Sequence, residues 1–433
     1  MNFQKLLVQS LLWRGVYFIT ILLLNIFLSR YLQAEGAGWI FYLTNWFSFL
    51  LLLGSLSMES AVTYYGSNQV ISKHKLVWLA VAWTTVVAVA IFAGISFYAD
   101  EIKEGSVDIV RYRKYALLYI SGILLTNFFT VLFYAQRNFF LPNLVMSLLN
   151  IALIIFIPKS QNTSWGIDEI LDVYFFFFLL QGLILWFTYS IKNGSWGHVA
   201  LPSLGENKLL IRYALLSLAA NVVFFLVYRI DYWFVRHSPV CSKEDLGNYI
   251  QVSKLGQMLL IIPQIMASAV FPQTASGTDR KDVNQTILII SRLLTQFYLL
   301  GIIVVLVFGK QLFPMIFGPT FDKMYQPMLL LMPGILSLSI LVLLSAYFAG
   351  KGNVSVNIKG AVIALIVVII GNAAFVNKYG IYAAAIISSV GYTVNLLFSL
   401  WQFHRDYKIG AKEFFSWRKD DLIWLKQLLT SKK

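Results

Sequence analysis

The sequence is poor in charge, cysteine and histidine. Only 12% of its 433 residues are Asp, Glu, Lys or Arg, while 58% are hydrophobic; a soluble domain carries about 25% charged residues. This shortage excludes a soluble enzyme, a nucleic-acid-binding domain and a disordered chain. The single cysteine, Cys241, excludes a disulfide framework and a thiolate metal cluster, and the four histidines form no pair at i, i+4. With no phosphate-binding glycine motif either, we expect no cofactor and no enzymatic activity.

Long apolar runs, by contrast, fill most of the chain. About 20 apolar residues make one membrane-spanning helix, and lipid-facing backbone must satisfy its own hydrogen bonds, which favours helices. The sequence therefore predicts an all-α polytopic membrane protein with about 12 transmembrane helices. The expected spans are 8–30, 39–62, 76–98, 114–135, 139–157, 169–191, 208–228, 249–271, 286–308, 327–349, 358–376 and 380–402.

The charge that is present is mostly positive. The formal net charge is +14, which we attribute to cytoplasmic loops, a basic tail and an anionic substrate rather than to nucleic acid. Lys and Arg divide almost evenly between the loops of the two faces, so the tail at 404–433 decides the orientation and places both termini in the cytoplasm. Aromatic residues within Ile409–Leu429 predict that this tail is amphipathic and lies on the cytoplasmic leaflet, with a plain solvated tail as the alternative.

Two short motifs recur in the second half of the chain. MESAV at Met58–Val62 returns as MASAV at Met266–Val270, and AQRNFFLPN at Ala135–Asn143 returns as AGKGNVSVN at Ala349–Asn357. The two offsets differ by only a few residues, which indicates a duplication. Because each half holds an even number of spans, the copies are expected to be related by a parallel pseudo-twofold repeat. The expected parts are an N-lobe at 1–200, a C-lobe at 201–403 and the tail at 404–433.

Charged residues inside the apolar runs are the main functional signal. A charge at the centre of a membrane helix costs about 2.5–3.5 kcal/mol on the insertion scale, so such residues mark functional sites. Most of them here are cations, and arginine matches phosphate with two parallel hydrogen bonds. Buried amides add groups suited to hydroxyl-rich ligands. The candidate residues for binding a pyrophosphate and a glycan are Arg14, Arg30, Arg212, Arg229, Lys254, Arg292, Asn25 and Asn45.

These candidates differ in their positions along the spans. Arg14 and Arg212 occupy corresponding places in the first and seventh spans, in the similar contexts LLWR and LLIR. Lys254 lies on a polar flank of the eighth span, which Pro263 is expected to kink because proline lacks an N–H. For arginines near span ends, the alternative is that the side chain reaches to the headgroups. Amides inside spans can equally bridge helices.

Two acidic residues, Glu59 and Asp231, are the candidates for coupling transport to a proton or sodium gradient. Glu59 lies near the end of the second span, where it is either an ion site or a group at the cytoplasmic border. Asp231 lies just beyond the end of the seventh span, where its alternative role is to pair with Arg229 or Arg236. The gradient is the expected energy source.

The segment that begins SLLWRGVYF at Ser10 resembles the first two spans of the polysaccharide transporter family, within the multidrug/oligosaccharidyl-lipid/polysaccharide exporter superfamily. The resemblance continues, through loose motifs, over nearly the whole chain at 133–143, 228–272, 313–334 and 379–395. It implies a MATE-like fold that carries undecaprenyl-pyrophosphate-linked oligosaccharides across the bacterial inner membrane for O-antigen, capsule or exopolysaccharide assembly. It also implies that Arg14 occupies the place of pyrophosphate-contacting arginines. Some members of the family have fourteen spans, against the twelve expected here.

The partners that this resemblance implies are the lipid-linked oligosaccharide, membrane lipids and polysaccharide polymerase or export machinery. A multidrug exporter of the same fold remains an alternative, although an exporter of hydrophobic cations would need carboxylates at membrane depth. A membrane-embedded glycan polymerase or transferase is the enzyme alternative. It normally needs a sizeable loop or domain with catalytic residues, and no long loop is expected in this chain.

Overall fold

The computed structural model describes residues 3–67, 70–97, 109–159, 167–275, 280–418 and 420–421. Over these residues the chain is helical and contains no strand, which confirms the all-α prediction. Ten helices are long and apolar enough to cross a membrane. The protein is therefore a multi-pass membrane protein, as the apolar runs predict.

Two of the ten helices change direction sharply and each cover two predicted spans. α1 (Phe3–Ser55) bends at Gln33, where φ is 58°, and α12 (Val354–Tyr407) bends at Gly380, where φ is also 58°. Gly380 adopts this left-handed conformation without strain because it has no side chain. Gln33 is not a glycine, and at this bend its side chain accepts a hydrogen bond of 3.0 Å from Thr320 Oγ1. With the two arms of α1 and α12 taken separately, the helices agree with the predicted set of twelve spans.

The chain divides into two compact units. The N-terminal unit comprises Met1–Leu32 and Ile40–Val222, and the C-terminal unit comprises Gln33–Trp39 and Val223–Lys433. The corner of α1 thus belongs to the C-terminal unit, and the helix that begins at Leu204 contributes to both units. The lobe boundary at residue 200 stays a prediction, because these units follow packing rather than the sequence repeat.

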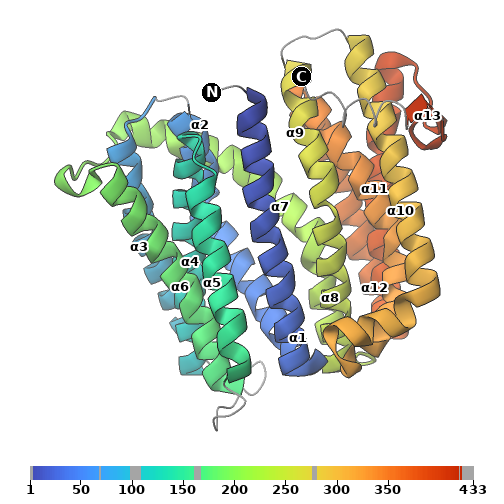
Figure 1. Ribbon diagram of the computed structural model, residues 1–433, viewed down its shortest axis with the longest axis horizontal. Helices are drawn as coiled ribbons and strands as arrows, with labels where there is room; N and C mark the ends of the chain where they lie inside the picture. The colour runs from blue at the N-terminus through green and yellow to red at the C-terminus, as the bar shows by residue number, and fades with distance from the viewer. Residues whose placement is uncertain are drawn as a thin grey trace. The chain divides into compact units, whose positions relative to one another are not determined.

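The N-terminal unit is built around the contact between its fourth and sixth helices, which run side by side in Figure 1. The helices cross closely at Gly122, where a Cβ atom would lie 2.3 Å from the backbone of Phe178. Besides most of α1, the elements are α2 (Met58–Ser67), α3 (Lys73–Phe97), α4 (Ile109–Ala135), α5 (Phe140–Lys159), α6 (Ile167–Lys192), η2 (Ser195–Gly197) and the first part of α7 (Leu204–His237).

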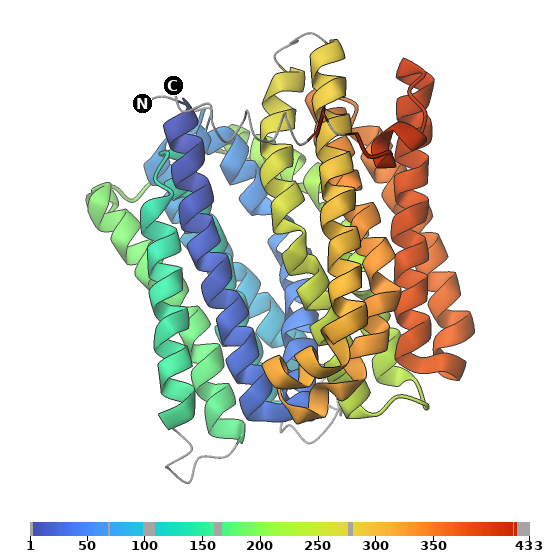
Figure 2. The ribbon, with the colours of Figure 1, turned by 45° about the vertical axis from the view of Figure 1, so that its right-hand side comes forward.

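The C-terminal unit packs around α11, which contacts α8, α9, α10 and α12. Figure 2 shows the two arms of α12 as a hairpin in orange-red and red. Beyond the end of α7, the elements are α8 (Lys243–Leu259), α9 (Ile261–Ala275), α10 (Arg280–Phe317), η3 (Pro319–Met324), α11 (Tyr325–Gly350), α12 (Val354–Tyr407) and α13 (Lys412–Phe415).

The predicted kink at Pro263 is confirmed as a break between α8 and α9. Proline lacks the N–H that would bond to the carbonyl of Leu259, four residues earlier. The hydroxyl of Tyr298 on α10 donates to that carbonyl instead, at 3.0 Å. The polar eighth span is therefore divided just beyond Gln257, and a neighbouring helix completes its hydrogen bonding.

Candidate functional site

The first predicted cation, Arg14, lies on α1 and meets an aromatic ring of α4. Its guanidinium carbon stands 4.7 Å from the ring centroid of Tyr134, a cation–π contact. The hydroxyl of Tyr134 in turn accepts a hydrogen bond of 2.9 Å from Asn143 Nδ2 on α5. Arg14 is exposed, so its charge remains accessible to an anion while the ring orients it.

Uncharged polar pairs connect the helices of the N-terminal unit. Asn150 Nδ2 donates to Thr20 Oγ1 at 3.1 Å, and the Ser48 and Tyr119 hydroxyls bond at 2.8 Å. Gln181 Nε2, which is buried, donates to an α4 hydroxyl at 3.1 Å. Hydroxyl and amide groups of this kind can bridge helices and can also exchange hydrogen bonds with a sugar.

The other predicted substrate-binding residues of the N-terminal unit lie on α1 and α7. Arg30 and Arg212 are exposed, on α1 and α7 respectively. Asn25 is buried and donates to the carbonyl of Ile21 in its own helix at 3.0 Å, while Asn45 is buried on the second arm of α1. Their roles in substrate binding stay predictions.

Glu59 lies in the first turn of α2, directly after a break in the chain. Leu56 and Ser57 have positive φ angles of 53° and 57°, so the backbone turns sharply before the carboxylate. Within the described residues, Glu59 Oε2 is buried and has no hydrogen-bond partner. A buried oxygen without a donor favours a proton or a cation, so the role of Glu59 in ion coupling stays a prediction.

The C-terminal unit brings two predicted cations, Arg229 of α7 and Lys254 of α8, into one half-buried cluster. Arg229 Nη2 donates to Gln257 Oε1 at 3.2 Å, and its guanidinium lies 5.7 Å from the ring centroid of Phe225. Lys254 is close enough to Arg229 for the two like charges to repel. A bound anion would relieve this repulsion, because opposite charge stabilises both cations. We refer to Arg229, Lys254 and Gln257 as the cation cluster.

Asp231 is almost completely buried, with 1% of its surface exposed. Its carboxylate accepts hydrogen bonds from the hydroxyl of Tyr249 on α8 and from Ser388 Oγ on α12, the latter at 2.9 Å. The guanidinium of Arg236 instead faces the ring of Trp39. Hydroxyl groups rather than a direct guanidinium partner therefore surround this acid, contrary to the alternative that pairs it with Arg236. We refer to Asp231, Tyr249 and Ser388 as the acid cluster.

Arg292 has a structural partner, which the sequence does not indicate. Its guanidinium forms two hydrogen bonds to the carboxylate of Asp421, at 2.6 and 2.7 Å, and both side chains are buried. It also donates to the carbonyl of Glu413 at 3.1 Å. With its charge neutralised by Asp421, Arg292 is an anchor for the C-terminal segment, and we omit it from the substrate site.

Related contacts show how the first part of the predicted tail is packed. α13 packs on α10 (Figure 1). Phe414 is fully buried, with its ring 5.5 Å from that of Phe403. The described part of the segment is therefore folded against the C-terminal unit, while its position on the cytoplasmic leaflet stays a prediction. The predicted amphipathic residues Trp424 and Leu425 lie outside the described residues.

Several site residues escape sequence reasoning. Gln257 could be found, because it follows Lys254 by three residues and shares its helix face. Ser388 joins Asp231 from 157 residues away, and Asp421 joins Arg292 from 129 residues away. No local pattern marks such partners, since serine is common in apolar helices and the acid lies in a basic tail.

Within the described part of the chain, no group of three or more His, Cys, Asp or Glu side chains could hold a metal ion. A scan against protein-family models gives no match, and a search of curated proteins gives none either. The fold, however, is shared with several solved structures.

An inward-facing multidrug resistance MATE family transporter of the MOP superfamily aligns with a TM-score of 0.68 and 15% identity, over 94% of this chain and 95% of the other. A MOP superfamily transporter from Pyrococcus furiosus aligns with a TM-score of 0.62 and 14% identity, over 93% and 94%. A variant of the Vibrio cholerae MATE transporter VcmN gives 0.61 and 13%, over 95% and 99%. The chain thus has the two-lobe fold of these transporters, as predicted.

Proposed function

We propose that the protein is an alternating-access flippase for undecaprenyl-pyrophosphate-linked oligosaccharides in the bacterial inner membrane, serving O-antigen, capsule or exopolysaccharide assembly. Transport rests on the fold that it shares with MATE transporters. The single observation that carries the substrate class is the cation cluster. In it, Arg229 Nη2 donates to Gln257 Oε1 at 3.2 Å, and Lys254 lies one turn before Gln257 on α8, so an anion bound there would face two cations.

A pyrophosphate suits this cluster better than a single carboxylate does. Its two phosphate groups can contact both cations, and the planar guanidinium of Arg229 can form parallel hydrogen bonds to phosphate oxygens. Gln257, already bonded to Arg229, holds the guanidinium in place. Arg14, oriented by Tyr134, supplies a separate accessible cation in the N-terminal unit.

The hydroxyl and amide pairs of the N-terminal unit suit the glycan part of the cargo. A sugar can replace the partner in pairs such as Asn150–Thr20 and Ser48–Tyr119 without leaving buried polar groups unsatisfied. The isoprenoid tail would stay in the lipid, because it is entirely apolar. The polar pairs of the N-terminal unit thus suit the glycan, and the cation cluster of the C-terminal unit suits the pyrophosphate.

A proton or sodium gradient would drive the cycle, with Asp231 and Glu59 as the candidate coupling sites. Asp231 is the stronger candidate, because its cluster joins α7, α8 and α12. A change in the charge of this carboxylate would alter hydrogen bonds to two other helices at once. Its own position near the cation cluster would link that change to anion binding, because Asp231 and Arg229 interact electrostatically.

The test is complementation of a flippase-deleted bacterial strain at matched protein levels. The double variant Arg229→Gln with Lys254→Gln keeps polar groups in place and removes both charges. We expect surface polysaccharide to fall by at least about tenfold, the loss from removing one charged hydrogen bond. Lys359→Gln on α12, an exposed lysine of the same unit, is the matched control. Full complementation by the double variant would contradict the proposal.

A multidrug exporter remains the second candidate, because two of the similar structures are described as MATE transporters and one as a multidrug resistance protein. The Pyrococcus furiosus structure is described as having a binding pocket of reverse polarity that suggests a different function. The positive cluster in this chain likewise disfavours a cationic drug. Resistance to cationic dyes, conferred by the native chain and lost in Glu59→Gln, would favour the exporter instead.

A further inference from the structure

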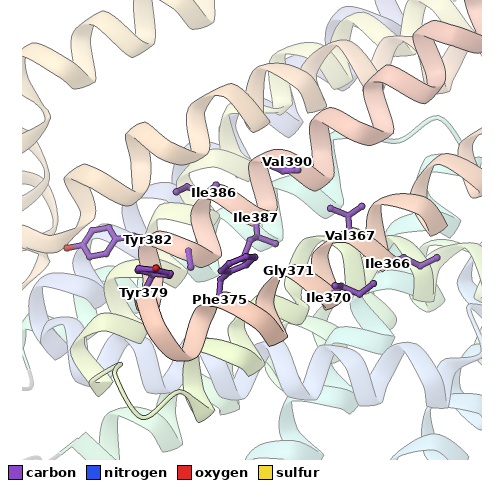
Figure 3. Close-up of a pocket in the computed structure, with 11 residues that line it drawn as sticks. Ile366, Val367, Ile370, Gly371, Phe375, Tyr379, Tyr382, Ile386, Ile387 and Val390 are labelled. Carbon is purple, nitrogen blue, oxygen red and sulfur yellow. The ribbon is translucent and has the colours of Figure 1, made fainter.

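The hairpin of α12 encloses an apolar groove. Its volume is about 730 Å³, within the range of about 300–1,000 Å³ that is typical of ligand pockets. Figure 3 shows it between the two arms, with Phe375 and Ile387 pointing toward one another. The residues that line it are Ile366, Val367, Ile370, Gly371, Phe375, Tyr379, Tyr382, Ala383, Ile386, Ile387 and Val390.

The length of the groove matches one leaflet of a bilayer. From Ile366 to Phe375 the first arm rises about 14 Å at 1.5 Å per residue, and the hydrocarbon core of a bilayer is about 30 Å thick. The groove begins beside the turn at Gly380 and ends near the middle of the spans. Several of its side chains, including Ile370 and Ile386, are exposed on the surface of the protein.

At the turn the groove meets a second, polar pocket of about 400 Å³. Tyr379 and Tyr382 line both, and tyrosines at this depth are typical of the boundary between lipid tails and headgroups. Lys378 also lines the polar pocket and, among the described residues, forms no salt bridge. The acid of this pocket, Asp245, is already paired with Lys323 at 2.7 Å, so the pocket retains a positive charge.

We propose that this hairpin binds one anionic phospholipid, with an acyl chain in the groove and its phosphate beside Lys378. An apolar channel one leaflet deep, ending at a tyrosine boundary and a cation, matches the three parts of such a lipid in order. The site is separate from the cation cluster, and it stands whether or not the proposed cargo is correct. The lipid would brace the two arms of α12, one of which carries Ser388 of the acid cluster.

The experiment is native mass spectrometry of the full chain in detergent with added phosphatidylglycerol or phosphatidylcholine. We expect one phosphatidylglycerol to be retained in preference to phosphatidylcholine. Ile386→Trp fills the groove and should lower retention about tenfold, which corresponds to excluding roughly two methylene groups. Lys378→Gln should reduce the preference for phosphatidylglycerol about fivefold, the contribution of one lysine near an anionic headgroup.

Matched controls lie on the same hairpin. Leu397→Trp adds the same bulk at an exposed position outside the groove, and Lys359→Gln removes a lysine at the other end of the first arm. Both should retain the lipid as the native chain does, and Val390→Trp should repeat the effect of Ile386→Trp. Unchanged retention in both groove-filling variants would overturn the proposal. Equal retention of the two phospholipids, or displacement of phosphatidylglycerol by a polyprenyl phosphate, would overturn it as well.

Discussion

The two units of this protein use polar groups in different ways. In the N-terminal unit, fully buried contacts between helices include neutral pairs such as Gln181–Thr126, and Arg14 is exposed over an aromatic ring. In the C-terminal unit, three charged groups are buried or half-buried and have specific partners: Arg229 with Gln257, Asp231 with Tyr249 and Ser388, and Arg292 with Asp421. The two units are therefore both helical, but they differ in the polar groups that they bury.

This difference predicts which unit's polar groups contribute more to the free energy of unfolding. A neutral hydrogen bond between membrane helices contributes about 0.6 kcal/mol on average, whereas removing one member of a buried ion pair costs about 3–5 kcal/mol. Substitutions in the C-terminal unit should therefore have larger effects than equivalent ones in the N-terminal unit. That expectation can be tested from the largest effect to the smallest.

The largest effect on stability is expected for Arg292→Ala. The substitution leaves Asp421 as a buried, uncompensated charge and removes the anchor of the C-terminal segment. The free energy of unfolding should fall by about 3–5 kcal/mol, which thermal unfolding in detergent would measure as a lower midpoint. The double variant Arg292→Leu with Asp421→Leu should recover most of the loss.

The matched control in the N-terminal unit is Lys114→Ala. It removes a salt bridge of 2.8 Å to Asp172, but both of those side chains are substantially exposed. Such a pair contributes about 0–1 kcal/mol. If Arg292→Ala and Lys114→Ala lowered the free energy of unfolding equally, the two units would not differ in how much their charged pairs contribute to stability.

The next effect is expected for Asp231→Asn. Asparagine has nearly the same shape and can still accept hydrogen bonds from Tyr249 and Ser388, so the fold should be retained. The amide of asparagine cannot change its charge, so the variant cannot couple transport to a gradient. We expect transport to fall by about tenfold, the change that corresponds to the free energy of one charged hydrogen bond. Surface polysaccharide, measured at matched protein levels, would show the loss. Native activity together with normal dependence on the gradient would exclude Asp231 as the coupling site.

A smaller effect is expected for Arg14→Gln. The cation–π contact with Tyr134 is exposed, where such contacts contribute about 0.5–1 kcal/mol, and Arg14 is one cation among several. Transport should fall two- to fivefold, about the change in affinity that this energy supplies. Arg14→Lys should retain more activity than Arg14→Gln, because it keeps the charge. A loss as large as that of the cation cluster would place the dominant anion contact in the N-terminal unit.

The fold could be predicted from the sequence because its cause is spread over hundreds of residues. Each apolar run must become a helix in lipid, so errors in single residues do not change the result. The break before Pro263 could also be predicted, because a proline inside any helix removes one backbone hydrogen bond whatever its surroundings. The fold of the segment from α13 to Asp421 could not be, because its anchor on Arg292 depends on one long-range pair.

The candidate site could be predicted in its cations and not in their partners. A charged residue in or beside an apolar run is easily recognised in a sequence, and Arg229, Lys254 and Asp231 are candidates for this reason. The groups that determine their roles are ordinary residues of other helices. Ser388 and Tyr249 resemble many hydroxyl residues of this chain, and only the packing of α12 and α8 against α7 brings them to Asp231.

The smallest effect is expected for Gln181→Leu, which tests the neutral side of the comparison. The side chain is buried on α6, and its loss leaves the hydroxyl of Thr126 to bond to its own helix, as hydroxyls commonly do. Thermal unfolding should show a change of about 0.6 kcal/mol or less, with transport nearly unaffected. Thr126→Val should give the same small change, and the double variant should add nothing further if the two groups act as one pair. A loss of several kcal/mol would mean that the stability of the N-terminal unit depends on its neutral hydrogen bonds as strongly as that of the C-terminal unit depends on its charged groups. The two units would then differ in the charge of their buried polar groups but not in how much those groups contribute to stability.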